Sequence, residues 1–200
     1  MTLPIAVCVS GRGSNLQALI DATRNGHLDA RIVLVASSRA DAPALERAMR
    51  AGIAAAVFKV IKVSREQSQR AMGIAIRDAG AQLIVLAGYD RILSDPFWDE
   101  IGDIPVINIH PSLLPAFGRL NNMKVHEAAI AAGATESGAT VHRAHRGTLD
   151  EGEILVQKRA PVLPGDTPQT LAERVLAVEH EALVEAVARF ARGVPVMPAR

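Results

Sequence analysis

The sequence is poor in cysteine and aromatic residues, and it has no long uncharged hydrophobic run. One cysteine among 200 residues, Cys8, excludes an internal disulfide and a multi-cysteine metal site. It also favours a reducing compartment, and we expect Cys8 to be an inert buried thiol on a strand. No run approaches the roughly 20 apolar residues that a transmembrane helix needs. The amino terminus lacks a basic segment followed by a long apolar one, so we expect no secretion signal, no membrane association and a cytoplasmic location.

The sequence also lacks an excess of charge of either sign. The 22 Lys and Arg residues nearly balance the 21 Asp and Glu residues, which indicates no general affinity for nucleic acid or anionic membranes. The six histidines are scattered without cysteine partners or His-x-x-x-His spacing, and this predicts no metal site. The remaining composition, 49% hydrophobic and 22% charged, is that of a soluble chain long enough for one domain with a proper core.

Short apolar runs alternate with amphipathic stretches along the chain. We expect strands at 4–9, 31–36, 54–60, 82–87, 106–110, 138–144 and 154–162. A first helix begins near residue 14, and others are expected at 44–50, 66–79, 94–101, 124–132 and 169–192. This alternation favours right-handed βαβ crossovers. We therefore predict one three-layer, Rossmann-like α/β domain over residues 1–200, with a mostly parallel twisted sheet and helices on both faces.

The run VINIHPSLLP at 106–115 contains two polar residues suited to catalysis. Asn108 and His110 share a strand face, because alternate side chains point the same way. Pro111 cannot continue the ladder, so both groups lie at the carboxyl end of the strand, where open parallel sheets bind ligands. An amide donor beside an imidazole suits chemistry at a carbonyl group. Alone, the pair is equally compatible with two satisfied polar residues at a strand end.

The segment SGRGSN at 10–15 lies between the first strand and the first helix. This order directs backbone N–H groups and the positive end of a helix at an anion. Ser14 and Asn15 could cap the helix or donate to a phosphate, and a plain βα turn with a capping serine is the alternative. No Gly-Lys-Ser/Thr follows, so this is not a Walker loop. A nicotinamide dehydrogenase is disfavoured because Leu16 replaces the third glycine and the second strand lacks an acidic end.

Four segments together resemble a known family: SGRGSN at 10–15, LAGYDRIL at 86–93, NIHPSLLP at 108–115 and LDEG at 149–152. In this order and spacing they resemble the phosphoribosylglycinamide formyltransferases, a branch of the folate-dependent formyltransferases. PVLPGDTP at 161–168 and RVLAVEH at 174–180 resemble the same family. The resemblance covers about residues 3 to 190. It implies a phosphate-binding half at about 1–100 and a folate-binding, catalytic half at about 101–200.

The resemblance implies a reaction and a role for each catalytic residue. The family transfers the formyl group of 10-formyltetrahydrofolate to the amine of N1-(5-phospho-D-ribosyl)glycinamide in de novo synthesis of the purine nucleotide IMP. Asn108 is then expected to stabilise the oxyanion, His110 to shuttle the proton, and Asp150 to raise the pKa of His110. The implied co-substrate is 10-formyltetrahydrofolate, with small-molecule substrates, no nucleic acid and no metal. Both a monomer and a homodimer fit the resemblance.

Matching the family segments also assigns residues to the two substrates. The glycinamide substrate is expected at Gly13, Ser14, Asn15, Leu176, Ala177, Val178 and Glu179. The folate is expected at Arg65, Asp90, Arg91, Ile92, Leu93, Asn108, Arg146, Gly147, Thr148, Leu149 and Asp150. Two of these positions also fit simpler interpretations. Arg65 is equally compatible with a solvated surface charge, and Glu179 with an exposed position on the last helix.

Three segments depart from the family pattern. The stretch 142–150 is one residue longer than the family pattern and carries the basic residues His145 and Arg146. Asp90 stands where the family commonly has an apolar residue. The segment 117–123 replaces a loop of Gly-Leu-His-Thr type and is longer. The folate-loop assignments depend on these segments, whereas Asn108 and His110 lie outside them.

Other polar and aromatic residues have structural interpretations. Phe97 and Trp98 are expected in the core rather than against a ligand, and His126 and His142 are expected to be ordinary surface or core histidines.

Three rival functions remain in view. A non-catalytic phosphate- or nucleotide-binding module is disfavoured, because Asn108, His110 and Asp150 are all present. Methionyl-tRNA formyltransferase would need a basic carboxyl-terminal domain, and formyltetrahydrofolate hydrolase an additional domain in front. We expect room for neither.

Overall fold

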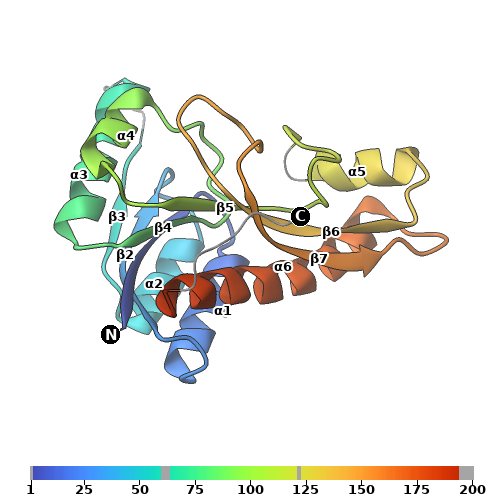
Figure 1. Cartoon of the computed structure of the whole chain (residues 1–200), viewed down its shortest axis with the longest axis horizontal. Helices are drawn as coiled ribbons and strands as arrows, with labels where there is room; N and C mark the ends of the chain where they lie inside the picture. The colour runs from blue at the N-terminus through green and yellow to red at the C-terminus, as the bar shows by residue number, and fades with distance from the viewer. Residues whose placement is uncertain (1, 60–63, 121–122, 194–200) are drawn as a thin grey trace.

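A seven-stranded sheet forms the centre of the molecule (Figure 1). The computed structural model describes residues 2–59, 64–120 and 123–193. The strands are β1 (Leu3–Val9), β2 (Ala30–Ser37), β3 (Ala55–Val57), β4 (Leu83–Leu86), β5 (Val106–His110), β6 (Glu136–Arg143) and β7 (Ile154–Pro161). Their spatial order is β3-β2-β1-β4-β5-β6-β7. Neighbours from β3 to β5 pair in parallel, whereas β6 pairs antiparallel with both β5 and β7.

Helices cover both faces of this sheet, which confirms the predicted three-layer α/β architecture. They are α1 (Ser14–Arg24), α2 (Ala44–Ala51), α3 (Arg65–Asp78), α4 (Asp95–Ile101), α5 (Met123–Ala131) and α6 (Pro168–Ala191). Helices α1, α2 and α6 pack on one face through a core that includes Leu16, Ala48 and Leu183. Helices α3 and α4 pack on the other face through Met72 and Phe97 (Figure 1).

Local sequence signals set the ends of these elements close to where they were predicted. Gly52 ends α2 with φ 71, the left-handed conformation that favours glycine at this position. Ser64 and Gln67 form a capping box at the start of α3. Strand β3 is shorter than the predicted strand at 54–60, whose residue 60 lies outside the described residues. The other predicted elements occur with ends shifted by a few residues.

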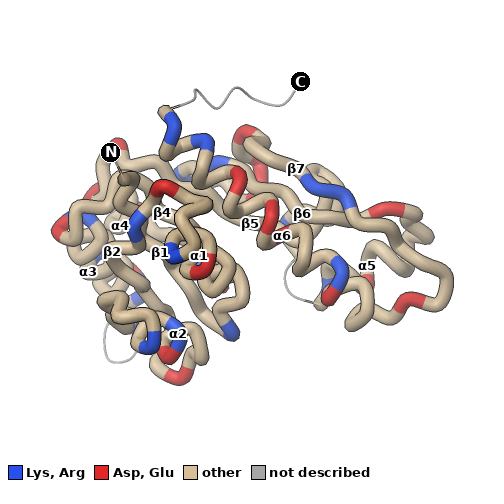
Figure 2. Tube along the Cα trace, turned by 90° about the horizontal axis from the view of Figure 1, so that it is seen from below, with Lys and Arg blue, Asp and Glu red and all other residues tan. Residues whose placement is uncertain are grey.

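Charged residues of both signs are interspersed along the chain (Figure 2), in keeping with the formal net charge of +1. Within residues 2–59, 64–120 and 123–193, no helix has the length and hydropathy to span a bilayer. Cys8 is fully buried in β1, and burial raises the pKa of its thiol to about 12. This environment fits the inert thiol that the sequence predicted.

Gly13 allows α1 to approach α2 closely. Its φ is 73, and a Cβ atom there would lie 2.6 Å from Ala44 Cβ. Gly13→Ala should therefore lower the free energy of unfolding by about 1–3 kcal/mol, from overlap and left-handed backbone strain, as measured by urea denaturation. Gly11→Ala is the matched control, since a Cβ at Gly11 meets nothing within 4 Å. Equal losses of stability in the two variants would contradict this account.

Candidate active site

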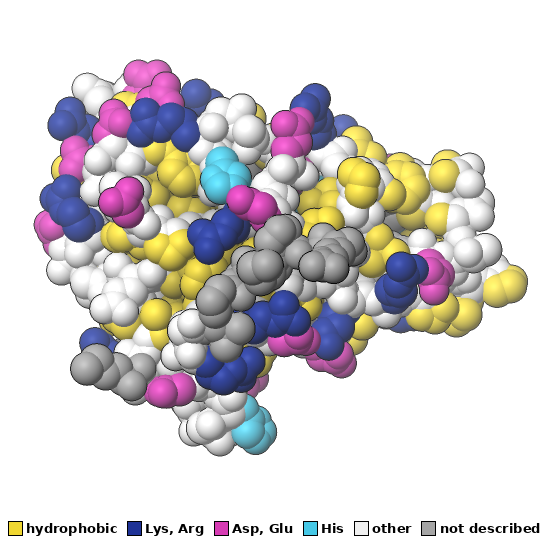
Figure 3. Space-filling model, in the orientation of Figure 1, with side chains coloured by type: hydrophobic (Ala, Val, Ile, Leu, Met, Phe, Trp, Pro, Cys, Tyr) yellow, Lys and Arg dark blue, Asp and Glu magenta, His cyan; other side chains and the backbone are white. Residues whose placement is uncertain are grey.

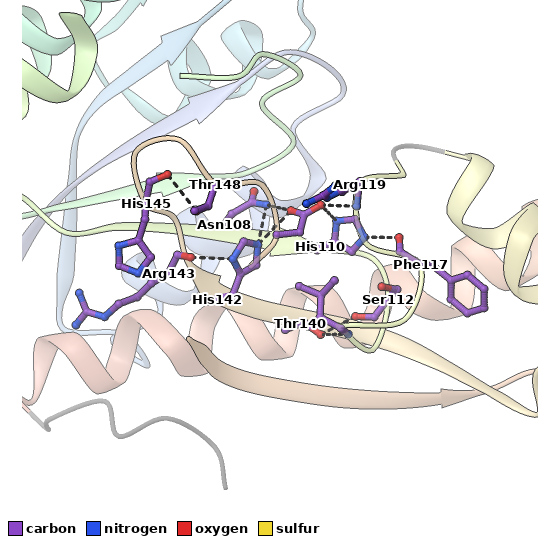
Figure 4. A network of polar contacts seen from close by, with 12 residues as sticks. Asn108, His110, Ser112, Phe117, Arg119, Thr140, His142, Arg143, His145 and Thr148 are labelled. Carbon is purple, nitrogen blue, oxygen red and sulfur yellow. Dashed lines mark hydrogen bonds and ion pairs between the residues drawn. The ribbon is translucent and has the colours of Figure 1, made fainter. Parts of the chain in front are cut away.

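Two adjacent strands bring Asn108, His110 and His142 together on one face of the sheet (Figure 4). Ile107 and Ile109 pack into the core beneath α1, α2 and α6, so Asn108 and His110 face the side of α3 and α4. The antiparallel register sets His142 of β6 directly opposite Asn108. The shared face predicted for Asn108 and His110 is thus confirmed, and β6 adds a third polar group.

Asp150, from the loop between β6 and β7, completes this group. Its Oδ2 lies 3.4 Å from His110 Nδ1, and its Oδ1 lies 3.4 Å from His142 Nε2. Asn108 Nδ2 donates to Asp150 Oδ1 at 3.5 Å and lies 3.1 Å from His142 Nε2. His142 Nδ1 faces the carbonyl of Arg143 at 2.8 Å. We call Asn108, His110, His142 and Asp150 the polar cluster.

The loop after β5 supports the cluster with backbone groups. The Phe117 carbonyl lies 3.2 Å from His110 Nε2, and the Arg119 amide donates to Asp150 Oδ2 at 2.9 Å. Phe117 and Arg119 have φ values of 58 and 64, which non-glycine residues rarely adopt. This segment is one of the three that the sequence analysis expected to depart from the family pattern. Its unusual backbone directs a carbonyl at the imidazole and an amide at the carboxylate.

Burial and neighbouring groups set the charges in the cluster. Burial lowers the pKa of His110 and outweighs Asp150 and the Phe117 carbonyl, which raise it. The expected effect of Asp150 on His110 therefore has the right sign, but the net shift of the His110 pKa is downward. Burial opposes ionisation of Asp150, but contacts with His142, the Arg119 amide and His110 together lower its pKa. At neutral pH the cluster thus contains a carboxylate beside a neutral His110.

His110 is well placed to accept a proton. Both of its ring nitrogens face acceptors, namely the Asp150 carboxylate and the Phe117 carbonyl. The neutral ring can donate to only one of them, whereas an imidazolium can donate to both. Proton uptake is thus favoured by the local contacts and opposed by burial, which suits a base that gains and releases a proton during a reaction.

The cluster opens into a cavity of about 550 Å³, part of which is open to solvent. The cavity is lined by Leu86, Tyr89, Arg91, Ile92, Leu93, Trp98, Asn108, His142, Arg143, Ala144, His145, Gly147, Thr148, Leu149 and Asp150. Apolar and aromatic side chains form one wall and the polar cluster another. His110 lies behind this wall and reaches the cavity through its contact with Asp150. Figure 3 shows hydrophobic side chains exposed between charged ones on the face of the molecule that is seen in Figure 1.

Most of the residues expected to bind folate border this cavity. Three do not. The Asp90 side chain turns away from the cavity and accepts a hydrogen bond from Ser38 Oγ at 3.2 Å, and the backbone N–H of Asp90 donates to Ser10 Oγ at 2.9 Å. The Arg146 guanidinium pairs with Asp99 on α4. Arg65 is exposed at the first position of α3.

A second candidate binding region lies where α1 meets α6. Gly13 is the N-cap of α1, and no side chain caps this end, so the capping role considered for Ser14 and Asn15 is wrong. The first backbone N–H groups of α1 therefore have no partner within the helix. Asn15 Nδ2 donates to Glu179 Oε2 at 2.7 Å, so Glu179 is not merely an exposed helix position. Burial raises the pKa of Glu179, and its contact with Asn15 opposes that shift.

Asn15 Oδ1 is buried and has no hydrogen-bond partner within the described part of the chain. Together with the Glu179 carboxylate it forms a pair of acceptors, which fits hydroxyl donors. The neighbouring N–H groups of α1 fit an anion. Residues 176–178 precede Glu179 inside the continuous helix α6. Their N–H and C=O groups are therefore both bonded within the helix, so we expect a ligand to contact these residues mainly through their side chains.

Sequence reasoning assigned neither substrate to seven residues that line the cavity: Leu86, Tyr89, Trp98, His142, Arg143, Ala144 and His145. Two of them were given other roles. His142 was expected to be an ordinary histidine, but it contacts both Asn108 and Asp150. Trp98 was expected in the core with Phe97; Phe97 is fully buried, whereas Trp98 is half-buried and lines the cavity. His126 is a buried histidine of α5, as expected. Among the residues that the structure describes, no three His, Cys, Asp or Glu side chains are grouped to hold a metal ion.

Residues 3–187 match the formyl transferase family. The chain is 37% identical over 190 residues to phosphoribosylglycinamide formyltransferase of Haemophilus influenzae, covering 94% of this chain and 87% of that protein. It is 41% identical over 191 residues to the human trifunctional purine biosynthetic protein adenosine-3, covering 94% of this chain. It spans only 14–18% of the length of such trifunctional relatives.

Solved structures give the same picture of the fold. Glycinamide ribonucleotide transformylase 1 from Symbiobacterium toebii matches with a TM-score of 0.90 and 39% identity, covering 100% of this chain and 92% of that one. Phosphoribosylglycinamide formyltransferase from Brucella melitensis matches with a TM-score of 0.86 and 40% identity over 100% of both chains.

Proposed function

The chain belongs to the formyl transferase family, and we propose that it transfers the formyl group of 10-formyltetrahydrofolate to the amine of N1-(5-phospho-D-ribosyl)glycinamide in de novo purine biosynthesis. The observation that carries this proposal is the polar cluster at the wall of an apolar cavity. It combines an amide donor, an ionised carboxylate and a neutral imidazole. Two relatives with this activity in their names, each covered over 87% of its length, support the choice of reaction.

Asn108 is the proposed donor to the formyl oxygen. Attack by the amine places negative charge on that oxygen, and a fixed N–H donor lowers the barrier. His142 orients the Asn108 amide through their 3.1 Å contact. The contact from Asn108 to Asp150 is longer, at 3.5 Å, so an oxyanion can compete for that N–H group. This combination of a fixed amide plane and a weakly held N–H supports an oxyanion role.

His110 is the proposed proton carrier. The attacking amine must lose a proton and the folate nitrogen must gain one. His110 is neutral at neutral pH, and its imidazolium would be stabilised by Asp150 and by the Phe117 carbonyl. Asp150 lines the cavity and contacts His110, so it connects the buried imidazole to the reacting groups.

The two binding regions suit the two substrates. The cavity wall of Tyr89, Ile92 and Trp98 fits a flat heteroaromatic ring such as a pterin. The free N–H groups at the start of α1 suit the phosphate of the glycinamide substrate, and the acceptors of Asn15 and Glu179 suit its ribose hydroxyls. No metal ion is needed for these steps. We also propose a cytoplasmic location.

A two-substrate assay tests the proposal. Purified protein is mixed with 10-formyltetrahydrofolate and phosphoribosyl glycinamide, and formation of tetrahydrofolate is followed by absorbance. We expect turnover that requires both substrates. Formate release without the amine would indicate a hydrolase instead. Binding of both ligands by folded protein without turnover would indicate a non-catalytic module and contradict the proposal.

Glu179→Gln should raise the KM for the glycinamide substrate about tenfold and leave kcat nearly unchanged. The reason is that an NH2 donor replaces one of the two acceptor oxygens offered to ribose hydroxyls, which weakens ground-state and transition-state binding alike. Steady-state kinetics with each substrate varied in turn measure this. Glu173→Gln is the control, because Glu173 is exposed on the same helix. An unchanged KM would remove Glu179 from the binding site.

A further inference from the structure

One wall of the cavity is built from irregular backbone. Tyr89, Arg91, Ile92 and Leu93 line the cavity, and they lie between β4 and α4, where the chain forms neither helix nor strand. Backbone N–H and C=O groups in such a segment must find partners elsewhere in the fold. The position of this wall therefore depends on the side chains that supply those partners.

Gln69 of α3 bonds to two such backbone groups. Its side chain accepts a hydrogen bond from the Ser94 amide at 2.6 Å and donates to the Ile92 carbonyl at 3.0 Å. Its Nε2 also lies 3.4 Å from Tyr89 Oη. These partners fix the orientation of the amide, because Ser94 N–H needs an oxygen and the Ile92 carbonyl needs an N–H group. Gln69 is only 2% exposed, and it does not line the cavity itself.

The chemistry of this position is specific. Gln69 lies on the same buried stripe of α3 as Met72 and Ile76, where an apolar residue would satisfy packing alone. A carboxylate there could accept but not donate, and an apolar side chain could do neither. Only a side chain with both functions satisfies Ile92 and Ser94 together.

We propose that Gln69 is a positioning residue for the folate substrate, which sets the half of this wall next to α4 without touching the ligand. This inference rests on the proposed function for the identity of the ligand. The other half of the segment is held separately, because Asp90 bonds to Ser10 and Ser38. Gln69 therefore controls the half that adjoins α4 and contains Ile92.

Gln69→Glu separates positioning from a general structural role. When the introduced carboxyl group is protonated, it can accept from the Ser94 amide and donate its O–H to the Ile92 carbonyl, as glutamine does. When it is ionised, it cannot donate and sets a negative charge against that carbonyl. Burial raises the pKa of such a carboxyl group, so its titration should fall between about pH 5 and about pH 8. Folate affinity in this variant should then weaken as pH rises.

Folate binding can be measured without turnover, because Trp98 is the only tryptophan in the chain and lines the cavity. Tetrahydrofolate is titrated against Trp98 fluorescence from about pH 5.5 to about pH 8.5, the range in which a buried carboxyl group titrates. Relative to the unmodified protein, Gln69→Glu should bind with similar Kd at the acid end and about tenfold weaker or more at the alkaline end. The Kd for the glycinamide substrate should change little. If Gln69→Glu unfolds at alkaline pH, Gln69→Met gives the test, with a weaker folate Kd at every pH.

The control is Gln67→Glu on the same helix. Gln67 is exposed and accepts from Ser64 N in a capping box that glutamate serves equally well. A Kd for tetrahydrofolate in folded Gln69→Glu and Gln69→Met that follows the unmodified protein at every pH would overturn the inference. So would equal weakening of both substrates. Normal tetrahydrofolate binding without formyl transfer in the unmodified protein would count against the proposed function alone.

Discussion

Asp150→Asn should lower kcat by about 10²-fold or more, while the protein stays folded. The carboxylate contacts His110 and His142 and accepts from the Arg119 amide. An amide of the same shape has no negative charge to stabilise an imidazolium. Its NH2 group would also face hydrogen-bond donors at a position where the carboxylate presents an acceptor oxygen. The backbone should tolerate the change, because residue 150 has φ 57, a conformation that asparagine adopts as readily as aspartate.

The pKa of His110 provides a second measurement on the same variant. Burial lowers this pKa and Asp150 opposes the shift, so removal of the charge should lower the His110 pKa further. NMR titration of the imidazole resonances measures it. Glu151→Gln is the control, because Glu151 is exposed, pairs with the Arg119 side chain and adjoins Asp150. Normal kcat and an unmoved His110 titration would place Asp150 outside the catalytic machinery.

The parts of the candidate site whose placement could be predicted from the sequence depend on local rules. Asn108 and His110 share a face because strand side chains alternate, and β5 ends at His110 because Pro111 cannot continue the ladder. The wall residues Arg91, Ile92 and Leu93 followed from a contiguous family segment. The position of Gly13 at the start of α1 could be predicted because a glycine segment lies between a strand and a helix. Each of these inferences needs only a few neighbouring residues.

The parts that were missed depend on contacts between distant segments. His142 belongs to the site only because β6 pairs antiparallel with β5 in a register that sets it opposite Asn108. Asp90 lies in the predicted segment, but Ser10 and Ser38, on two other strand ends, turn it from the cavity. Trp98 had a local signal that was overlooked. Adjacent helical residues point about 100° apart, so Phe97 and Trp98 could not both face the core.

The direction in which the pKa of His110 shifts is a further property that sequence spacing could not reveal. It depends on the balance between burial and two acceptors, one of which is the Phe117 carbonyl in the loop after β5. The match of LDEG at 149–152 to a family segment finds Asp150 but gives no measure of burial. The three-dimensional contacts therefore change the description of His110 from an imidazole charged by its aspartate to one that is neutral at rest and stabilised once it is protonated.

His110→Ala should lower kcat by about 10²-fold to 10⁴-fold and leave the KM for the glycinamide substrate nearly unchanged, as expected for loss of proton transfer. The dependence of activity on pH gives a second measurement. Because the His110 pKa lies below its usual value of 6.5, the neutral base predominates at pH 7. The activity of the unmodified protein should therefore fall only at a pH below 6.5, where His110 becomes protonated. In the variant, this dependence should disappear from the residual rate.

His126→Ala is the control for removing a buried imidazole, because His126 lies on α5 and is 4% exposed. Both variants should lose some stability through the cavity that they create, as thermal unfolding can show. Only His110→Ala should lose kcat. If both lose activity in proportion to stability, His110 is a packing residue. If glycinamide binding collapses in His110→Ala while folding is retained, the imidazole holds substrate rather than protons, and Asp150 would then act on binding as well.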